Sequence, residues 1–464
     1  MRSNTNHGLP VIKTTIPGPK SQQLLSKLRE LEAPNLTNTD NEITIVWERT
    51  TGANIIDVDG NQYIDMAAGL NVANIGHTHP AVQAAVSKQI EEMLQGMGDF
   101  HANIRKIEFM EFIQKIIPIP NAKMIVSVNG SDAVDSALKT ANLATGKSGY
   151  IAFYGAYHGM GAKSIEVTAR HHFRRPFKNE TKKSTAFAPY PYCYRCPYGE
   201  QVDTCKLTCL KTVQDMIENT ASGVEDVAAV IIEPIQGRGG VVVASQKFLQ
   251  GLREICDRNN VLLIFDEILT GFGRTGKMFS FLHSGVIPDI MTIGKGLSSG
   301  YPISVCAAKQ EVMDKAWGQY NGEPIHTSTF QGNPLGSVIA MASIKELLNS
   351  NLVEKSHYDG LYLQKELRNR IGAHPNVGDI RGNGLMVGIE LVKDRDTKEA
   401  APELCWEIIR RAMKKGVLLL NGGHQVNVLC LTPPLCITNE QLNFVINTLE
   451  TILNELKVEL YQQN

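Results

Sequence analysis

Two unbroken apolar runs near the middle of the chain most constrain how it can fold. The segments AAVIIEPI (228–235) and VLLIFDEI (261–268) are apolar until each reaches a carboxylate. Strands that are apolar on both faces are typical of a parallel sheet covered by helices on both sides. The segment between them, QKFLQGLREICDRN, has helical periodicity. This β–α–β order predicts an open, mainly parallel mixed sheet flanked by helices, an α/β fold.

The two ends of the chain predict a smaller α+β domain. The segment NIIDVDGNQYIDM (54–66) predicts a β-hairpin that turns at Asp59 and Gly60. Near the C-terminus, GDIRGNGLMVGIELV predicts two strands around a glycine turn, and an amphipathic helix ends the chain. We expect an N-terminal segment that contributes to the small domain, a large domain, and a C-terminal part of the small domain: residues 1–75, 76–337 and 338–464.

The charge balance argues against several kinds of partner. The 464 residues carry a net charge of -1, and only 20% are charged. No basic block predicts a nucleic-acid partner, and no apolar run approaches the ~18 residues that span a membrane. The N-terminal MRSNTNHGLPVIK lacks the apolar core of a secretory signal. The sequence therefore predicts a cytoplasmic enzyme.

Four of the nine cysteines cluster in YCYRCPYGEQVDTCKLTC. An odd total without a secretory signal argues against a disulfide framework. Four thiolates at this spacing can close around a structural zinc ion. Reduced cysteines in a surface loop are the simpler alternative. The residues concerned are Cys193, Cys196, Cys205 and Cys209.

Two motifs place polar residues where strands of the sheet end, which is where open parallel sheets bind ligands. In VNGSDAVDSALK, Gly130 and Ser131 begin a helix whose free N–H groups favour a phosphate. An ordinary N-cap is the alternative. Asp266 ends an apolar strand, where a carboxylate is costly unless it meets a cation or a donor. For Glu267 we expect a structural role in the following turn.

The third motif is a lysine in TIGKGLSSG. Gly294 and Gly296 remove side-chain bulk on both sides of Lys295, which predicts a lysine that must reach a planar ligand. A desolvated lysine has a lowered pKa and attacks carbonyls. A solvated lysine in a loop is the alternative for this motif alone. Together, a phosphate cradle, a carboxylate for a ring nitrogen and this lysine are the parts that a pyridoxal phosphate enzyme needs.

With these motifs the chain resembles the class III aminotransferases, the ω-transaminase and 4-aminobutyrate aminotransferase group of fold-type I pyridoxal phosphate enzymes. The resemblance covers nearly the whole chain, in ordered motifs that include GNQYIDMAAGLNVANIGHTHP, YGAYHGM, EPIQGRGG, FDEILTGFGRTGKM, TSTFQGNP and LTPPLCIT. It implies pyridoxal 5'-phosphate as the coenzyme and transfer of an amino group between an amine and a keto acid or aldehyde.

The resemblance assigns roles in coenzyme binding. It implies that Lys295 bonds covalently to the coenzyme and later moves protons, and that Asp266 keeps the pyridine nitrogen protonated. Gly130 and Ser131 would hold the phosphate.

The remaining ring contacts also follow from the resemblance. Tyr157, which His158 follows, would stack on one face of the ring, and Ile268 would pack on the other. Thr329 would reach the phosphate of the neighbouring subunit, which implies a homodimer with shared sites.

The substrate motifs depart from the family pattern. Many members carry a carboxylate-binding arginine just before PPL, where this chain has Cys430, although the glutamate that partners that arginine is present as Glu233. Members that act on ω-amino acids often have an arginine after YHG, where this chain has Met160. Together with Leu70, these residues predict a less charged pocket that favours a neutral amine or an aldehyde over 4-aminobutyrate or ornithine.

One arginine stands where the family usually has an acidic residue. Arg238, in QGRGG, is either a relocated carboxylate clamp or, as we expect, part of a structural salt bridge.

Two other functions stay open at this point. A racemase or epimerase would use the same scaffold, and the cysteine-containing loop resembles a feature of a subgroup that includes broad-specificity racemases. A metal-binding interaction module built on the four cysteines is a third hypothesis, which the intact Lys295 and Asp266 motifs oppose.

Overall fold

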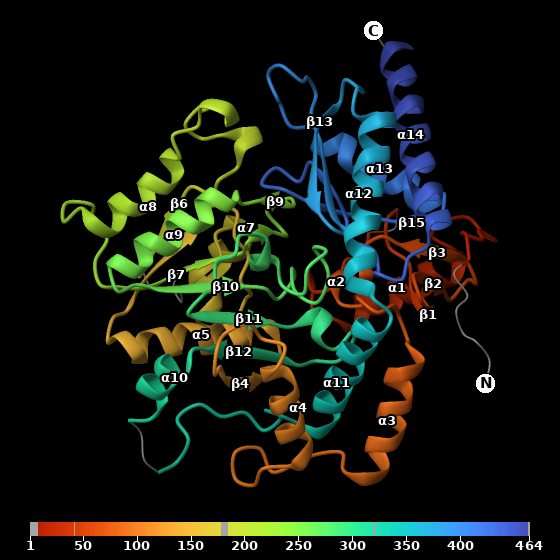
Figure 1. The fold of residues 1–464 in the computed structure, drawn as a ribbon. Helices are drawn as coiled ribbons and strands as arrows, with labels where there is room; N and C mark the ends of the chain where they lie inside the picture. The colour runs from red at the N-terminus through yellow and green to blue at the C-terminus, as the bar shows by residue number, and fades with distance from the viewer. Residues whose placement is uncertain (1–7, 41, 178–183, 320–321, 463–464) are drawn as a thin grey trace.

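A seven-stranded sheet forms the centre of the computed structural model, which describes residues 8–40, 42–177, 184–319 and 322–462 (Figure 1). Strand β12 is antiparallel to both of its neighbours, and the other paired strands of this sheet are parallel. The predicted mixed, mainly parallel sheet is therefore confirmed. Its strand order is β4 (Lys123–Ser127), β12 (Ser304–Ala308), β11 (Ile290–Ile293), β10 (Leu262–Asp266), β7 (Val227–Ile232), β5 (Gly149–Phe153) and β6 (Thr185–Ala188).

Helices cover both faces of this sheet, as the apolar runs require. On one side α5 (Gly130–Thr145) packs with α10 (Gln310–Trp317), and on the other α8 (Thr208–Glu218) packs with α9 (Gln246–Arg258) (Figure 1). Successive residues of β10 belong to two different hydrophobic cores, one on each face of the sheet. Ile264 packs in the core on the α5 side, whereas Leu263 and Phe265 pack in the core on the α9 side. A strand buried on both faces has no room for polar residues before its end.

The C-terminal region adds a second, antiparallel sheet. The predicted pair of strands around a glycine turn is confirmed as β13 and β14, with Gly384 at φ 54° between them. Helix α11 (Pro334–Asn349) packs mainly against two helices between residues 80 and 114, whereas the other helices of this region pack beside the sheet (Figure 1). Its strands and helices are β13 (Val377–Asn383), β14 (Met386–Leu391), β17 (Val428–Leu431), β16 (Leu420–Gly422), α12 (Leu352–Ile371), α13 (Pro402–Lys414) and α14 (Asn439–Gln462).

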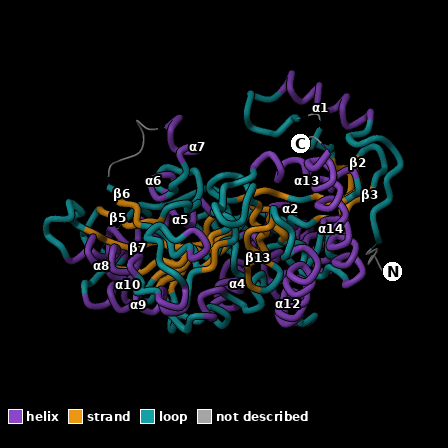
Figure 2. Tube along the Cα trace, turned by 90° about the horizontal axis from the view of Figure 1, so that it is seen from above, coloured by secondary structure: helices purple, strands orange, loops and turns teal. Residues whose placement is uncertain are grey.

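The two ends of the chain share a third sheet. The predicted hairpin at Asp59–Gly60 is confirmed as β2 and β3, and β15 from the C-terminal region pairs parallel to β3. Seen from above, this sheet and α1 lie at the opposite end of an elongated molecule from α8 and β6 (Figure 2). The elements are β1 (Trp47–Thr51), β2 (Asn54–Asp57), β3 (Gln62–Asp65), β15 (Val417–Leu418) and α1 (Pro19–Leu31).

Shorter elements complete the described chain. They comprise α2 (Ala68–Asn71), α3 (Pro80–Glu92), α4 (Ile104–Gln114), α6 (Ser164–Val167), α7 (His171–Arg174), β8 (Ile235–Gln236), β9 (Val242–Val243) and five 3-10 helices, η1 (Arg175–Phe177), η2 (Cys193–Arg195), η3 (Val202–Thr204), η4 (Ser280–His283) and η5 (Lys295–Leu297). Among the described residues, no helix is both long and apolar enough to cross a membrane. Residues 1–7, which belong to the segment judged to lack a secretory signal, lie outside the described part.

Candidate active site

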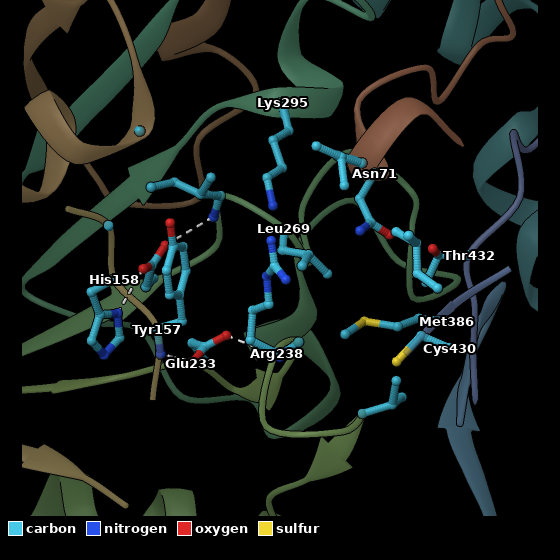
Figure 3. A pocket seen from close by; sticks show the side chains of 18 of the residues that line it. Asn71, Tyr157, His158, Glu233, Arg238, Leu269, Lys295, Met386, Cys430 and Thr432 are labelled. Carbon is cyan, nitrogen blue, oxygen red and sulfur yellow. Dashed lines mark hydrogen bonds and ion pairs between the residues drawn. The ribbon is translucent and has the colours of Figure 1, made fainter. Parts of the chain in front are cut away.

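A cavity of about 260 Å³ lies where the carboxyl end of the large sheet meets the antiparallel C-terminal sheet (Figure 3). Residues from α5, from the loop after β5, and from the ends of β10 and β11 form one side, and residues of β14, β16 and β17 form the other. The cavity brings together most of the residues singled out in the sequence: Leu70, Gly130, Ser131, Tyr157, His158, Glu233, Arg238, Asp266, Ile268, Lys295 and Cys430.

Lys295 follows β11 directly and points into the cavity (Figure 3). Its pKa is lowered to about 8, first because the surrounding protein desolvates the charged amine and also because Arg238 lies near; Asp266 acts in the opposite direction. The backbone at Lys295 is left-handed, with φ 45°. A residue other than glycine is strained there, and such strain is held mostly at functional sites.

The flanking glycines have a different role from the one expected. A Cβ at Gly296 would lie 2.3 Å from the amide nitrogen of Asn74, so this position requires glycine for close packing. A Cβ at Gly294 would meet Ser304 at an ordinary 3.4 Å. Clearance around the lysine is therefore the wrong explanation for the glycines, although Lys295 does face the cavity.

Asp266 ends β10 and is only 5% exposed. Its Oδ2 lies 2.7 Å from His158 Nδ1, and its Oδ1 accepts hydrogen bonds from the Ile268 N–H and the Thr292 hydroxyl, each at 3.1 Å. These bonds fix the orientation of the carboxylate and leave it at the cavity wall. The Nε2 of His158 is buried without a partner among the described residues.

The start of α5 borders the cavity through Gly130 and Ser131. Asn129 caps the helix by accepting from the Asp132 N–H. The first N–H groups of a helix have no partner within it and attract anions. The Ser131 hydroxyl accepts from the Met160 N–H at 3.1 Å, which leaves its own proton free to donate.

Tyr157 and Ile268 line the cavity from different loops. The Tyr157 ring packs against Phe173 with the ring centroids 5.1 Å apart, and the guanidinium of Arg238 lies 5.6 Å from the Tyr157 centroid. Ile268 packs close to Gly130, where a Cβ would lie 3.1 Å from its Cδ1. An aromatic and an aliphatic side chain thus both border the space in front of Lys295.

Glu233 does not pair with an arginine among the described residues. Its two oxygens accept backbone hydrogen bonds, from the Tyr157 N–H at 3.1 Å and from the Gly237 N–H at 3.0 Å. Burial raises the pKa of Glu233 to about 6. The expected structural salt bridge of Arg238 is likewise wrong, because no described carboxylate lies within ion-pair distance of its exposed guanidinium.

Two predicted residues do not reach the cavity of their own chain. Met160 is 37% exposed and does not line the cavity, because its backbone is held to Ser131 while its side chain faces outward. The interpretation that Met160 lines the cavity of its own chain is therefore wrong. Thr329 is exposed, and its carbonyl accepts from the Gln95 side chain at 2.7 Å.

The predicted zinc site is not supported. Among the described residues, no group of three or more His, Cys, Asp or Glu side chains is arranged to hold a metal ion. The four thiols have different surroundings: Cys193 is exposed, Cys209 is buried in the core beside α9, and the Cys205 thiol donates to Glu200 at 3.2 Å. The fourth, Cys196, is half-buried. The simpler alternative, reduced cysteines, describes this loop.

Sequence patterns missed several residues that line the cavity from the C-terminal sheet and its surroundings. They are Asn71, Val241, Leu269, Met386, Leu420, Asn421 and Thr432. Asn71, Leu269 and Thr432 lie within the quoted motifs, but nothing in those motifs assigned them a role. The others are not marked by any local spacing.

The donor set fits pyridoxal phosphate. A desolvated amine, a buried carboxylate anchored by three hydrogen bonds and the open start of a helix border one cavity. These groups match a carbonyl, a ring nitrogen and a phosphate, respectively. The unpartnered Nε2 of His158 adds a buried polar atom on the Asp266 side.

This fold and cavity define a pyridoxal-phosphate-dependent transferase of fold type I. Residues 36–453 match the family model for Aminotransferase class-III. The chain is 35% identical to the 4-aminobutyrate aminotransferase of Escherichia coli, over 89% of this chain and 94% of that protein. It is 33% identical to the leucine/methionine racemase of Thermococcus litoralis, over 89% of this chain and 91% of that protein.

A solved structure gives the same result. The ω-transaminase from Pseudomonas jessenii in complex with PMP superposes with a TM-score of 0.87 at 26% identity, covering 93% of this chain and 98% of that one. The chain belongs to the class III aminotransferase family, as its motifs predicted.

The lowered pKa of Lys295 gives a testable pH dependence. The neutral amine is the nucleophile, so in the coenzyme-free protein labelling of Lys295 by an amine-selective reagent such as trinitrobenzenesulfonate should reach half its maximal rate near pH 8. Mass spectrometry of the peptide around position 295 measures this rate. A midpoint in the ordinary lysine range, near pH ~10.4, would contradict the expected desolvation.

Proposed function

We propose that this aminotransferase moves an amino group between a primary amine or amino acid and a keto acid or aldehyde, with Lys295 and Asp266 as its catalytic residues. One observation carries the proposal: the Lys295 amine, the Asp266 carboxylate and the start of α5 border a single cavity. Bound pyridoxal phosphate would supply a carbonyl and an electron-withdrawing ring.

The side chains divide the work. The Lys295 amine is the covalent anchor and, once displaced by substrate, accepts and returns a proton at Nζ, because its lowered pKa makes both directions accessible near neutral pH. Asp266 would hold a proton on the ring nitrogen of the bound coenzyme, and His158 orients Asp266 through the 2.7 Å contact. Gly130 and Ser131 would bind the phosphate of the coenzyme.

Ring contacts keep the reacting atoms in place. Tyr157 and Ile268, which both line the cavity, would hold the ring between them and exclude water from it. Glu233 fixes the backbone at Tyr157 and Gly237, so it positions residues rather than contacting the reacting atoms.

A donor and acceptor screen tests this function. The purified chain, loaded with pyridoxal phosphate, is incubated with amines and amino acids in the presence of pyruvate or 2-oxoglutarate, and the new amino acid is quantified. Product that depends on both partners supports the proposal. Absence of product with every pair, in protein that binds the coenzyme, contradicts it.

Racemisation is a second candidate because two similar proteins are named leucine/methionine racemase and isoleucine 2-epimerase. Incubation with one enantiomer of leucine, without a keto acid, separates the two reactions. Inversion at the α-carbon identifies a racemase. Conversion of the bound coenzyme to its amine form identifies a transaminase.

We also propose that the active unit is a homodimer. A cluster of exposed apolar side chains surrounds the contact between the 94–104 segment and the loop before α11, where Gln95 donates to the Thr329 carbonyl and Asn103 to the Gly332 carbonyl. Exposed apolar patches of this kind mark interaction sites. The cluster comprises Leu94, Met97, Phe100, Ile104 and Phe330. Thr329, whose carbonyl accepts from Gln95 in the 94–104 segment, would then reach the partner's phosphate site.

Replacing Phe100 tests the dimer. Phe100 is 76% exposed in the single chain, so Phe100→Asp should leave the fold intact but raise the dimer dissociation constant at least about 30-fold, the loss expected of an interface anchor. Light scattering coupled to size exclusion measures the change. Tyr358→Asp on α12, which is also exposed but lies outside the cluster, is the control. A wild-type monomer would contradict the proposal.

The cytoplasmic location and the limits of the two domains stay predictions from the sequence.

A further inference from the structure

Arg238 is the only arginine among the described residues that line the cavity, and it has no anionic partner in the described chain. It points toward Lys295 from the opposite side of the cavity (Figure 3). Its one described side-chain contact is with the face of Tyr157. Arginines that serve structure pair with carboxylates or carbonyls, whereas this guanidinium keeps its donors free.

A second unneutralised cation lies beside it. Arg170 donates to two backbone carbonyls, that of Arg238 at 3.4 Å and that of Gly423 at 3.2 Å, and no described carboxylate pairs with it. The pKa of Arg170 is lowered, first by burial and then by the charge of Arg238. Two neighbouring guanidinium groups repel each other, so their arrangement is favourable when an anion lies beside them.

The backbone of Arg238 is held from both sides. Its carbonyl accepts from the Gly423 N–H at 3.0 Å as well as from Arg170, and the preceding residue, Gly237, is bonded to the buried Glu233. The loop is therefore tied to both the large sheet and the C-terminal sheet. Because the backbone of Arg238 is held in place, its guanidinium loses little conformational entropy when it binds a ligand.

The cavity offers a second free donor. The side-chain N–H2 of Asn421, on β16, is buried and has no hydrogen-bond partner in the described chain, and Asn421 lines the same cavity. An unpaired buried donor is costly, so it is expected to meet an acceptor from a ligand. Asn421 neighbours the Arg238 loop, because the Gly423 N–H that bonds Arg238 lies two residues on.

Apolar side chains line much of this end of the cavity: Val241, Leu269, Met386 and Cys430. The uncharged polar residues Asn71 and Thr432 lie beside Met386 and Cys430 (Figure 3). Burial raises the pKa of the Cys430 thiol to about 11, so it is neutral at physiological pH. One carboxylate can bind between Arg238 and Asn421. A second carboxylate on the same substrate would meet uncharged groups at this end, because no described lysine or arginine lines the cavity apart from Lys295 and Arg238.

We propose that Arg238, assisted by Asn421, binds the α-carboxylate of the amino donor and of the keto acid, and that the substrates it selects are monocarboxylates with a small or apolar side chain, such as alanine and pyruvate, over the dicarboxylates glutamate and 2-oxoglutarate. This inference rests on the proposed aminotransferase function and names its substrate class. Arg170 is a positioning residue, which supports the loop and adds positive charge.

Variants of Arg238 in the coenzyme-loaded enzyme test the inference. For each enzyme, kcat/KM is measured for alanine and for butylamine, which carries no carboxylate. In Arg238→Met the ratio of the alanine value to the butylamine value should fall about 10- to 100-fold, the loss expected for a charge-assisted hydrogen-bond pair. Arg238→Lys should recover part of it, because lysine keeps the charge but not the fork of donors.

A non-reacting probe separates affinity from chemistry. Calorimetry should show that propionate binds to the coenzyme-loaded wild-type enzyme. Arg238→Met should lower the affinity for propionate about 10- to 100-fold, the same loss as in the kinetic ratio. Arg395→Met is the matched control, since Arg395 is exposed and donates only to the Gly372 carbonyl among the described contacts; it should leave the ratio and the propionate affinity unchanged.

Each outcome has a distinct meaning. If the wild type reacts with no amine, the proposed function fails. If it reacts, but Arg238→Met lowers the alanine and butylamine values equally, or if 2-oxoglutarate is used as well as pyruvate, the assignment of Arg238 or of the substrate class is overturned while the aminotransferase function stands.

Discussion

Replacing Lys295 by methionine is expected to lower kcat/KM for amino transfer about 10⁴-fold, the upper end of what a positioned proton-transfer group contributes. The same nitrogen is both the covalent anchor and the acid–base group, so both functions are lost together. Methionine keeps the length of the chain and suits an enclosed position. Steady-state assays with the best donor found in the screen measure the loss.

A second readout shows whether the lysine acts by covalent attachment. Borohydride reduction of the loaded wild-type enzyme should fix the coenzyme to the peptide around position 295, and the variant should show no label there. Lys277→Met is the control, because Lys277 is exposed and donates only to the Leu282 carbonyl among the described contacts. A Lys295→Met enzyme with more than about a tenth of the wild-type activity would be inconsistent with acid–base catalysis by this residue.

The central sheet was predictable because its strands are buried on both faces. Such strands must be apolar throughout, so a carboxylate at the end of a run marks the edge of the sheet. That rule placed Asp266 at the cavity wall, and Lys295 follows the adjacent parallel strand, whose Thr292 is the register partner of Asp266. Local sequence was enough for both residues because neighbouring parallel strands end at the same edge.

Other parts of the site depend on contacts that no local pattern records. Arg170 and Gly423 are 253 residues apart, yet they meet beside Arg238. Asn421 sits on a three-residue strand whose partner, β17, also carries Cys430. Packing of the separate C-terminal sheet against loops of the large sheet, with the hydrogen bond from the Gly423 N–H to the Arg238 carbonyl, brings them to the cavity. Contacts between such distant segments are not encoded by local spacing.

The errors have a common physical cause. Met160 follows Tyr157 and His158 closely, but neighbouring loop residues point in different directions, and its N–H bonds Ser131 while its side chain faces outward. The expected salt bridge of Arg238 was wrong because no described carboxylate pairs with it, and the nearby Glu233 uses both oxygens on backbone N–H groups. In each case the residue type was informative, but backbone hydrogen bonds set the direction in which the side chain points or the groups that it contacts.

Two adjacent carboxylates at the end of β10 offer the sharpest comparison of catalytic and structural roles. Asp266 faces the cavity, whereas Glu267 is fully buried and accepts from the N–H groups of Ser280 and Phe281 at 3.0 and 2.7 Å and from the Thr270 hydroxyl. Burial raises the pKa of Glu267 to about 7. The two side chains differ in what they touch although they are neighbours in the chain.

Asp266→Asn should lower kcat about 10²- to 10³-fold, the range seen when one preorganised electrostatic partner is removed. The amide keeps the shape of the side chain but carries no charge to hold a proton on the ring nitrogen, and it alters the 2.7 Å contact with His158. Glu267→Gln, the matched control, should keep kcat within about threefold and instead lower the melting temperature by several degrees, because it disturbs a buried hydrogen-bond cluster. Rate assays and thermal unfolding of the two variants measure both effects. Equal losses of kcat in the two variants would mean that Asp266 acts through the fold, not through the coenzyme.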